Sequence, residues 1–279
     1  MSKRNSQTAK TAARERLRQE RERQAKRDKV KRQVIVACSI VGVLAIAGGV
    51  GYAVVQANKP SHWEALKSAK VVAPANTTGT DGTTVVIGKS TAKKTLKVYE
   101  DPRCPICAQF EQTVGTTVKK DIDDGKFKIQ YIGGTFIDGD QLGKGTIGTR
   151  GEGSKNAMSA MGAALNVSPE AFLEYKSALY SKQWHPDETS DKFKGRDYLL
   201  KVADTVPALK NSTAFQNAVK NGTYDAWALA MSKTFDTNKD GVTGTPSFVM
   251  NGKVLTTSAG NPPMTVGEFT SLVDAALKA

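Results

Sequence analysis

Two cysteines separated by two residues lie between an apolar run and a helix-forming run, and this arrangement constrains the fold most. Cys104 and Cys107 follow a strand-like run at 95–99, and a helical pattern at 108–122 comes next. A second alternating run, 127–132, follows that helix. Strand, helix and strand in this order form a βαβ unit, in which the two strands are parallel. The sequence therefore predicts an α/β domain with the cysteine pair at the start of a helix.

The cysteine pair has three chemical interpretations. Zinc would need two more ligands, and only His62 and His185 remain, at no recognised spacing. Covalent haem would need a histidine after the second cysteine, where the chain has Ala108. Thiol–disulfide exchange needs only the pair, because a helix N-terminus stabilises a thiolate. Exchange is therefore favoured, and we expect no metal and no cofactor.

The positive charge of the chain is concentrated at its N-terminus. Of the net charge of +13, residues 1–33 contribute +9, because they hold thirteen Lys/Arg and four acids. Residues 9–32 lack Gly and Pro and are rich in helix-forming residues, which predicts an exposed helix. We interpret 1–33 as a basic cytoplasmic tail, helical or disordered, with contact to anionic lipid headgroups as the alternative. The globular part is close to neutral, so we expect no nucleic-acid partner.

An uncharged apolar run at 34–55 follows the basic tail. Its 22 residues are enough to cross a bilayer as a helix, which takes about 20. The preceding Lys/Arg cluster predicts a cytoplasmic N-terminus and an extracytoplasmic catalytic domain. A cleaved signal peptide, with small residues near 55–57, is the alternative, but the run is longer than a usual signal core. We therefore predict a single-pass membrane anchor that contains Cys38, followed by a tether at 56–82.

The remaining patterns place further elements around the cysteine pair. We expect a strand at 83–87, a glycine-rich mobile surface loop at 133–153, helices over about 154–235, a hairpin at 247–256 and a closing helix at 265–277. Asp236 to Gly241 begins like a calcium loop, but the twelfth position is Ser247 rather than Glu. We interpret that segment as a turn, and His62 and His185 as structural or exposed residues.

Two separated segments, 99–110 and 244–253, resemble the DsbA-like branch of the thioredoxin superfamily, particularly its membrane-anchored actinobacterial members. The resemblance covers about residues 70–279. It implies a thioredoxin-like α/β fold over 83–279 with an inserted helical domain at about 154–235, preceded by the N-terminal transmembrane helix. It also implies that Pro246 is cis and lies beside the cysteines, and that Thr245 contacts the substrate chain.

The same resemblance implies roles around the cysteine motif. Cys104 is expected to be the attacking, substrate-linked sulfur, and Cys107 the buried, resolving sulfur. Pro105 and Ile106 form the intervening dipeptide, and Arg103 and the helix N-terminus are expected to favour the thiolate.

An expected acid is missing from the strand. Many relatives carry a buried acid six residues before the first cysteine, where this chain has Val98. Glu100 and Asp101 are the candidate proton acceptors in its place.

These features together predict a membrane-anchored, extracytoplasmic thiol–disulfide oxidoreductase. It would oxidise cysteines of unfolded secreted proteins and be reoxidised by a quinone-linked membrane oxidase. Two alternatives are open: a reductase or cytochrome-maturation thioredoxin, and a non-catalytic peptide-binding chaperone module that uses the groove near Pro246.

Overall fold

The computed structural model describes residues 2–57, 61–139 and 151–279. The chain divides into two units, Met1–Ser61 and His62–Ala279, and each is described by itself. Most of the predicted glycine-rich loop, 140–150, lies outside the described residues.

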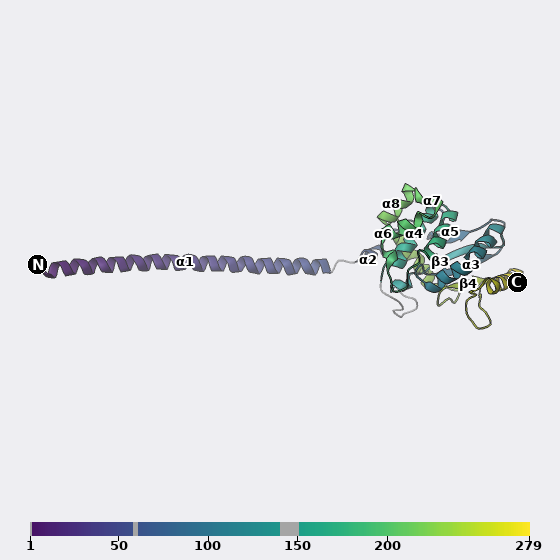
Figure 1. Cartoon of the computed structure of the whole chain (residues 1–279). Coiled ribbons are helices and arrows are strands. Elements are labelled where there is room, and N and C mark those ends of the chain that lie inside the picture. Colours follow the sequence, from purple (N-terminus) through teal and green to yellow (C-terminus); the bar gives the residue numbers. More distant parts are fainter. Residues whose placement is uncertain (1, 58–60, 140–150) are drawn as a thin grey trace. The chain divides into compact units, whose positions relative to one another are not determined.

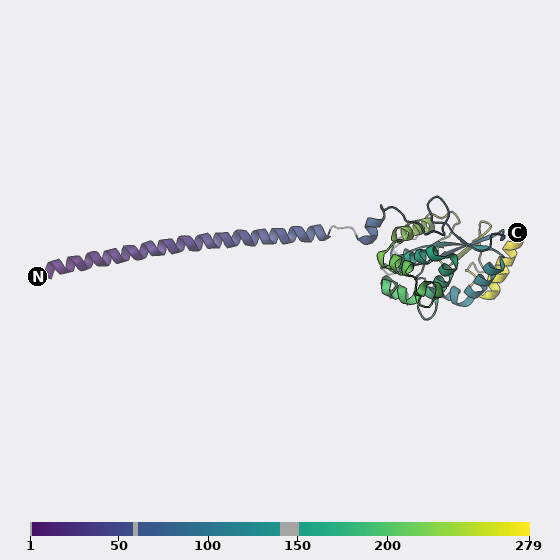
Figure 2. The ribbon, with the colours of Figure 1, turned by 90° about the horizontal axis from the view of Figure 1, so that it is seen from above.

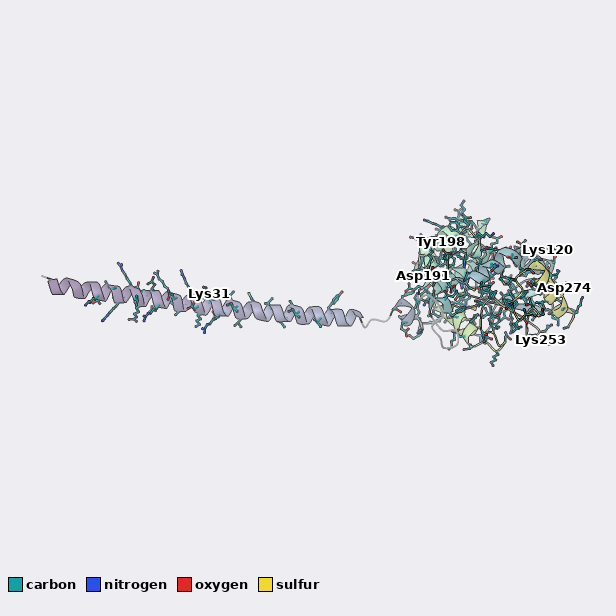
Figure 3. The ribbon with its side chains drawn as sticks, turned by 60° about the horizontal axis from the view of Figure 1, so that its bottom comes forward. Lys31, Lys120, Asp191, Tyr198, Lys253 and Asp274 are labelled. Atoms are coloured by element: carbon teal, nitrogen blue, oxygen red, sulfur yellow. The ribbon has the colours of Figure 1, made fainter. Side chains whose placement is uncertain are left out.

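The first unit contains helix α1 (Ser2–Ala57), which is continuous over 56 residues (Figure 1). Its basic segment is helical and exposed, as predicted for 9–32, and Lys31 projects from it into solvent (Figure 3). Within the described residues, no helix combines the length and the apolar character that crossing a bilayer requires. The membrane-spanning segment expected at 34–55 is therefore not confirmed.

The second unit is built on a five-stranded sheet in the order β1-β3-β2-β4-β5. Its strands are β1 (Val85–Ile87), β2 (Thr95–Glu100), β3 (Lys128–Gly133), β4 (Ser247–Met250) and β5 (Lys253–Val254). Strands β2 and β3 are parallel and are joined by helix α3 (Pro105–Asp124), so the predicted βαβ unit is confirmed. The other three pairings are antiparallel. The central strand β2 thus ends immediately before the cysteine motif.

A helical insertion separates β3 from β4, as predicted. It comprises η1 (Phe136–Asp138), α4 (Gly153–Val167), α5 (Pro169–Tyr180), η2 (Lys192–Lys194), α6 (Arg196–Ala203), α7 (Pro207–Lys210), α8 (Thr213–Asn221) and α9 (Asp225–Asp236). The short helix α2 (His62–Leu66) contacts α9, and the closing helix α10 (Val266–Lys278) lies beside α3 (Figure 2).

Local sequence signals explain where the helices begin and end. Helix α3 has Cys104 as its N-cap and a proline at its first position, and it ends at Gly125, whose φ of 79° favours glycine. Ser168 caps α5, and its hydroxyl accepts a hydrogen bond from the Ala171 N–H. Thr265 and Glu268 form a capping box at the start of α10.

The core consists of two apolar clusters. The larger one packs the sheet against α3, α10 and the inserted helices. The smaller one surrounds the cysteines and contains Tyr99, Cys104, Cys107, Ala108, Ile132, Phe136, Ile137, Tyr180, Phe235, Val242 and Val249. The second strand of the predicted hairpin is shorter than expected: it covers 253–254 rather than 253–256.

Candidate active site

The two cysteines occupy different environments although they are three residues apart. Cys104 is the N-cap of α3, where its Sγ accepts a hydrogen bond from the Cys107 backbone N–H at 3.4 Å. Cys104 is 5% exposed, whereas Cys107 is fully buried. Both thiols are free, so the structure describes the reduced, dithiol form. An incoming sulfur therefore reaches Cys104 more readily than Cys107.

The loop before β4 brings a second segment to the cysteines. The Thr245–Pro246 peptide bond is cis, and the Thr245 carbonyl oxygen accepts a hydrogen bond from the Cys104 thiol at 3.7 Å. Antiparallel pairing of β4 with β2 places this loop at the end of β2, where α3 begins. The cis bond expected at Pro246 and the contact of the preceding Thr245 with Cys104, 141 residues away in sequence, are thus observed.

The thiols differ in acidity as well as exposure. Hydrogen bonds from Cys107 and from the side chain of Thr245 outweigh burial and lower the pKa of Cys104 from 9.0 to about 7. Burial, together with the neighbouring Cys104 and Glu100, raises the pKa of Cys107 well above its usual value. At neutral pH Cys104 is therefore the sulfur that is substantially ionised.

Glu100 lies at the centre of an ion cluster behind the cysteines. Its carboxylate is fully buried and lies 3.2 Å from the Nζ of Lys176, which also pairs with Glu111 at 2.6 Å. Burial raises the pKa of Glu100 to about 7, although Lys176 opposes the shift. Neither Glu100 oxygen has a well-aligned hydrogen bond within the described residues. A carboxyl that titrates near neutrality and interacts electrostatically with both thiols suits proton exchange.

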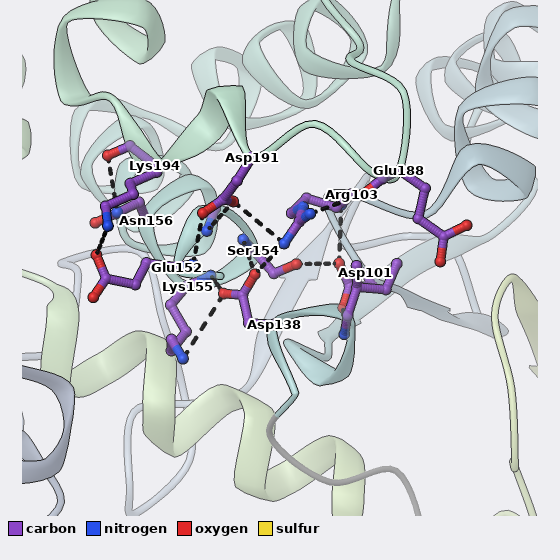
Figure 4. A network of polar contacts seen from close by, with 12 residues as sticks. Asp101, Arg103, Asp138, Glu152, Ser154, Lys155, Asn156, Glu188, Asp191 and Lys194 are labelled. Atoms are coloured by element: carbon purple, nitrogen blue, oxygen red, sulfur yellow. Dashed lines mark hydrogen bonds and ion pairs between the residues drawn. The ribbon is translucent and has the colours of Figure 1, made fainter. Parts of the chain in front are cut away.

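Asp101 and Arg103 lie in the turn between β2 and α3 and belong to a second cluster. The buried Arg103 guanidinium contacts Asp138 at 2.7 Å and Asp191 at 3.3 Å (Figure 4). Asp101 accepts hydrogen bonds from the Ser154 hydroxyl and from the backbone N–H groups of Arg103 and Ile137. Burial raises the pKa of Asp101 to about 7.

This second cluster changes the interpretation of Arg103. The sequence suggested that Arg103 favours the thiolate, but its guanidinium is directed toward two aspartates of the helical insertion. The main groups that lower the pKa of Cys104 belong to Cys107, Thr245 and Ile106. Ile106 is itself 45% exposed beside the site, while Pro105 begins the helix.

The partners that the helical insertion supplies could not be predicted from the sequence. Lys176 comes from α5 and Asp138 from η1, and neither carries a local motif. Glu111 had a usable signal, because it lies seven residues after Cys104 and so falls near the same face of α3 two turns later. His62 contacts Asp225 at 2.7 Å and His185 contacts the Leu179 carbonyl at 3.3 Å. The described residues contain no cluster of His, Cys, Asp or Glu that could hold a metal.

A dithiol at a helix N-terminus, facing a cis-proline loop on a sheet with a parallel βαβ unit, defines a thiol–disulfide oxidoreductase of the thioredoxin type. The thioredoxin family model matches residues 80–275, and the chain belongs to this family.

Two curated relatives are similar to this chain, and the name of the first agrees with this class. The chain is 27% identical over 172 residues to disulfide bond formation protein D of Bacillus subtilis. The match covers 61% of this chain and 68% of that relative. It is 23% identical over 172 residues to the serine/threonine-protein kinase PknE of Mycobacterium tuberculosis. That match covers 61% of this chain but only 29% of the kinase.

Solved structures show the same fold. A thiol–disulfide oxidoreductase, MdbA from Actinomyces oris, aligns with a TM-score of 0.57 at 19% identity, covering 75% of this chain and 94% of that chain. The oxidised DsbA of Mycobacterium tuberculosis aligns with a TM-score of 0.55 at 21% identity, covering 70% and 93%. The predicted resemblance to DsbA-like members of the thioredoxin superfamily and the predicted enzyme class, a thiol–disulfide oxidoreductase, are confirmed.

Proposed function

We propose that this oxidoreductase works as an oxidase, which passes its Cys104–Cys107 disulfide to cysteines of unfolded secreted proteins outside the cytoplasm. The observation that carries the proposal is the contrast between the two thiols. Cys104 has a lowered pKa and faces Thr245, whereas Cys107 is buried with a raised pKa. Stabilising the reduced thiolate raises the reduction potential of the pair and makes its disulfide a stronger oxidant.

The exchange proceeds in two balanced steps. A client thiolate attacks Cys104 Sγ of the disulfide, which forms a mixed disulfide and releases Cys107 as a thiolate that takes up a proton. A second client thiolate then attacks the client sulfur of the mixed disulfide, and Cys104 leaves as a thiolate. The client loses two electrons and gains a disulfide, and the enzyme ends as the dithiol.

Several neighbouring residues support these steps. Thr245 and Pro246 form the surface on which the client's extended backbone pairs beside Cys104. Glu100 is the proton donor for departing Cys107, because its carboxyl interacts with that thiol and titrates near neutrality. Asp101 and Arg103 fix the turn between β2 and α3, which sets the position of Cys104.

We infer in addition that residues 34–55 hold the enzyme at the cell membrane, with the N-terminus in the cytoplasm. The run has no charged side chain, and its Val41, Leu44 and Ile46 are each more than 60% exposed in α1. A quinone-linked membrane oxidase is the partner that would restore the disulfide. Alkaline extraction of cell membranes tests the anchor: the chain is expected to stay in the membrane pellet, and its release into the supernatant would contradict the inference.

The reduction potential of the pair tests the direction of the reaction. Equilibration with glutathione buffers is expected to give a value clearly above about −200 mV, in the range of oxidising members of the superfamily. A value near about −270 mV, as in thioredoxin, would overturn the oxidase proposal and favour the reductase or cytochrome-maturation role. Full function of Cys104→Ser in cells would instead favour the chaperone module.

A further inference from the structure

The loop between α9 and β4, residues 237–246, is fastened to the central strand by one aspartate. Asp240 accepts hydrogen bonds from the Lys97 Nζ at 2.7 and 3.0 Å and from the Tyr99 hydroxyl at 2.5 Å. Lys97 and Tyr99 are both on β2. The ion pair is partly buried, with the Asp240 side chain only 13% exposed, so these contacts hold a defined position.

The same loop resembled a calcium site in sequence, but its oxygen atoms are already engaged. The Asn238 side-chain oxygen accepts from the backbone N–H groups of Asp240 and Val242, each at 3.1 Å. The Asn238 amide donates to the carbonyl oxygens of Phe235 and Val242. The segment is therefore a turn, as predicted, and it directs Asp240 toward β2.

The residues that follow Asp240 in this loop lead to the active site. Val242 is buried in the apolar cluster that contains both cysteines. The Ser247 hydroxyl donates to the Gly244 carbonyl at 2.8 Å, and Ser247 is paired with Tyr99 in the sheet. Thr245, which contacts Cys104, lies between these two attachments. The position of Thr245 thus depends on how the loop is held on β2.

We propose that Asp240 is a positioning residue, which holds Thr245 against the Cys104 sulfur and thereby sets the reactivity of that sulfur. The proposal rests on the proposed exchange at Cys104 and adds the residue that tunes it. Asp240 itself touches no reacting atom. It acts through its hydrogen bonds with Lys97 and Tyr99, which hold the loop against strand β2.

Positioning and direct electrostatics predict opposite signs for the same substitution. Removal of a nearby negative charge would by itself stabilise the Cys104 thiolate and lower its pKa. Release of the loop would move Thr245 away from Cys104, and because the Thr245 side chain lowers that pKa in the intact site, the pKa would rise. Asp240→Ala therefore distinguishes the two effects.

The test is a pH titration of thiolate absorbance in the reduced full-length protein carrying Cys38→Ser, which removes the exposed third thiol, with circular dichroism to check folding. Asp240→Ala is expected to move the Cys104 midpoint upward by about one pH unit, and Tyr99→Phe, which removes one hydroxyl, to move it upward by less. Lys239→Ala, an exposed neighbour in the same loop, is the matched control and should leave the midpoint unchanged.

A double variant shows whether the effect passes through Thr245. In a Thr245→Val background, Asp240→Ala is expected to add no further shift, because the Thr245 hydroxyl that lowers the pKa of Cys104 is already absent. A midpoint that falls or stays constant in folded Asp240→Ala, or shifts that add fully in the double variant, would overturn the proposal. If Asp240→Ala does not fold, Tyr99→Phe with an unchanged midpoint overturns it as well. The titration reads Cys104 directly, so its result is separate from whether the protein oxidises clients.

Discussion

Two charged clusters flank the end of β2, and they are built differently although they begin at adjacent residues. The Arg103 cluster comprises Asp101, Arg103, Asp138, Ser154 and Asp191. The Lys176 cluster comprises Glu100, Glu111 and Lys176. Glu100 is the last residue of β2, whereas Asp101 follows it in the turn that leads to α3.

The clusters differ in how completely their carboxylates are satisfied. Asp138 accepts hydrogen bonds from backbone N–H groups at the start of α4, and Asp101 accepts from the backbone N–H groups of Arg103 and Ile137 and from the Ser154 hydroxyl. Glu100 has an ion pair but no well-aligned hydrogen bond within the described residues. A buried network in which every carboxylate is hydrogen-bonded holds its side chains in one geometry. A buried carboxylate with few hydrogen bonds is poorly stabilised as an anion, so it takes up a proton readily. We therefore assign positioning to the Arg103 cluster and proton exchange to the Lys176 cluster.

The largest expected effect is a loss of stability in Arg103→Met. The substitution leaves the buried Asp138 without its guanidinium, and breaking such a pair typically costs about 3–5 kcal/mol. Urea unfolding measures this loss. Lys119→Met, which removes an exposed ion-pairing cation, is the control and should cost less than about 1 kcal/mol. Equal losses of unfolding free energy in the two variants would show that the Arg103 cluster does not have the positioning role assigned to it.

Lys176→Met is expected to destabilise the protein less, by about 1–3 kcal/mol, because Glu100 can take up a proton when its cation is removed. The pKa of Glu100 should rise further, since Lys176 lowers it in the intact cluster. The midpoint of the pH profile for client release should shift to higher pH in the same variant. A stability loss as large as that of Arg103→Met, with an unmoved profile, would remove the distinction between the clusters.

Glu100→Gln tests the pH dependence that the raised pKa implies. A carboxyl whose folded-state pKa is raised from 4.5 to about 7 makes unfolding easier as pH rises between these values. The free energy of unfolding of the wild type should therefore fall by about 2–3 kcal/mol more than that of the variant between pH 4.5 and 7. Urea midpoints across this range give the measurement. Parallel curves for the two proteins would mean that Glu100 does not titrate there.

The smallest effect is expected for Glu111→Gln, at about 0.5–1 kcal/mol. Its carboxylate is partly exposed at 12%, and Lys176 keeps its other partner, Glu100. A loss above about 2 kcal/mol in thermal or urea unfolding would show that Glu111, rather than Glu100, is the main partner of Lys176.

The sequence predicted those parts of the site that local patterns and family motifs carry. The dithiol, the βαβ unit and the turn at Asn238 follow from nearby residues, and the approach of Pro246 follows from the family resemblance. Lys176, Asp138 and the direction of Arg103 depend on how the insertion packs against β2, so no short pattern encodes them. The contact of Asp240 with β2 is likewise tertiary, because it joins residues more than 140 positions apart.

Trapping of mixed disulfides with Cys107→Ala tests the central claim most directly. In this variant a client thiol that has joined Cys104 cannot be displaced by the resolving sulfur. We expect a disulfide-bearing model peptide to form a stable adduct, which mass spectrometry assigns to Cys104, and we expect Cys104→Ala to form no such adduct at Cys107. The absence of any adduct at Cys104 of the folded protein, or preferential reaction at Cys107, would contradict it.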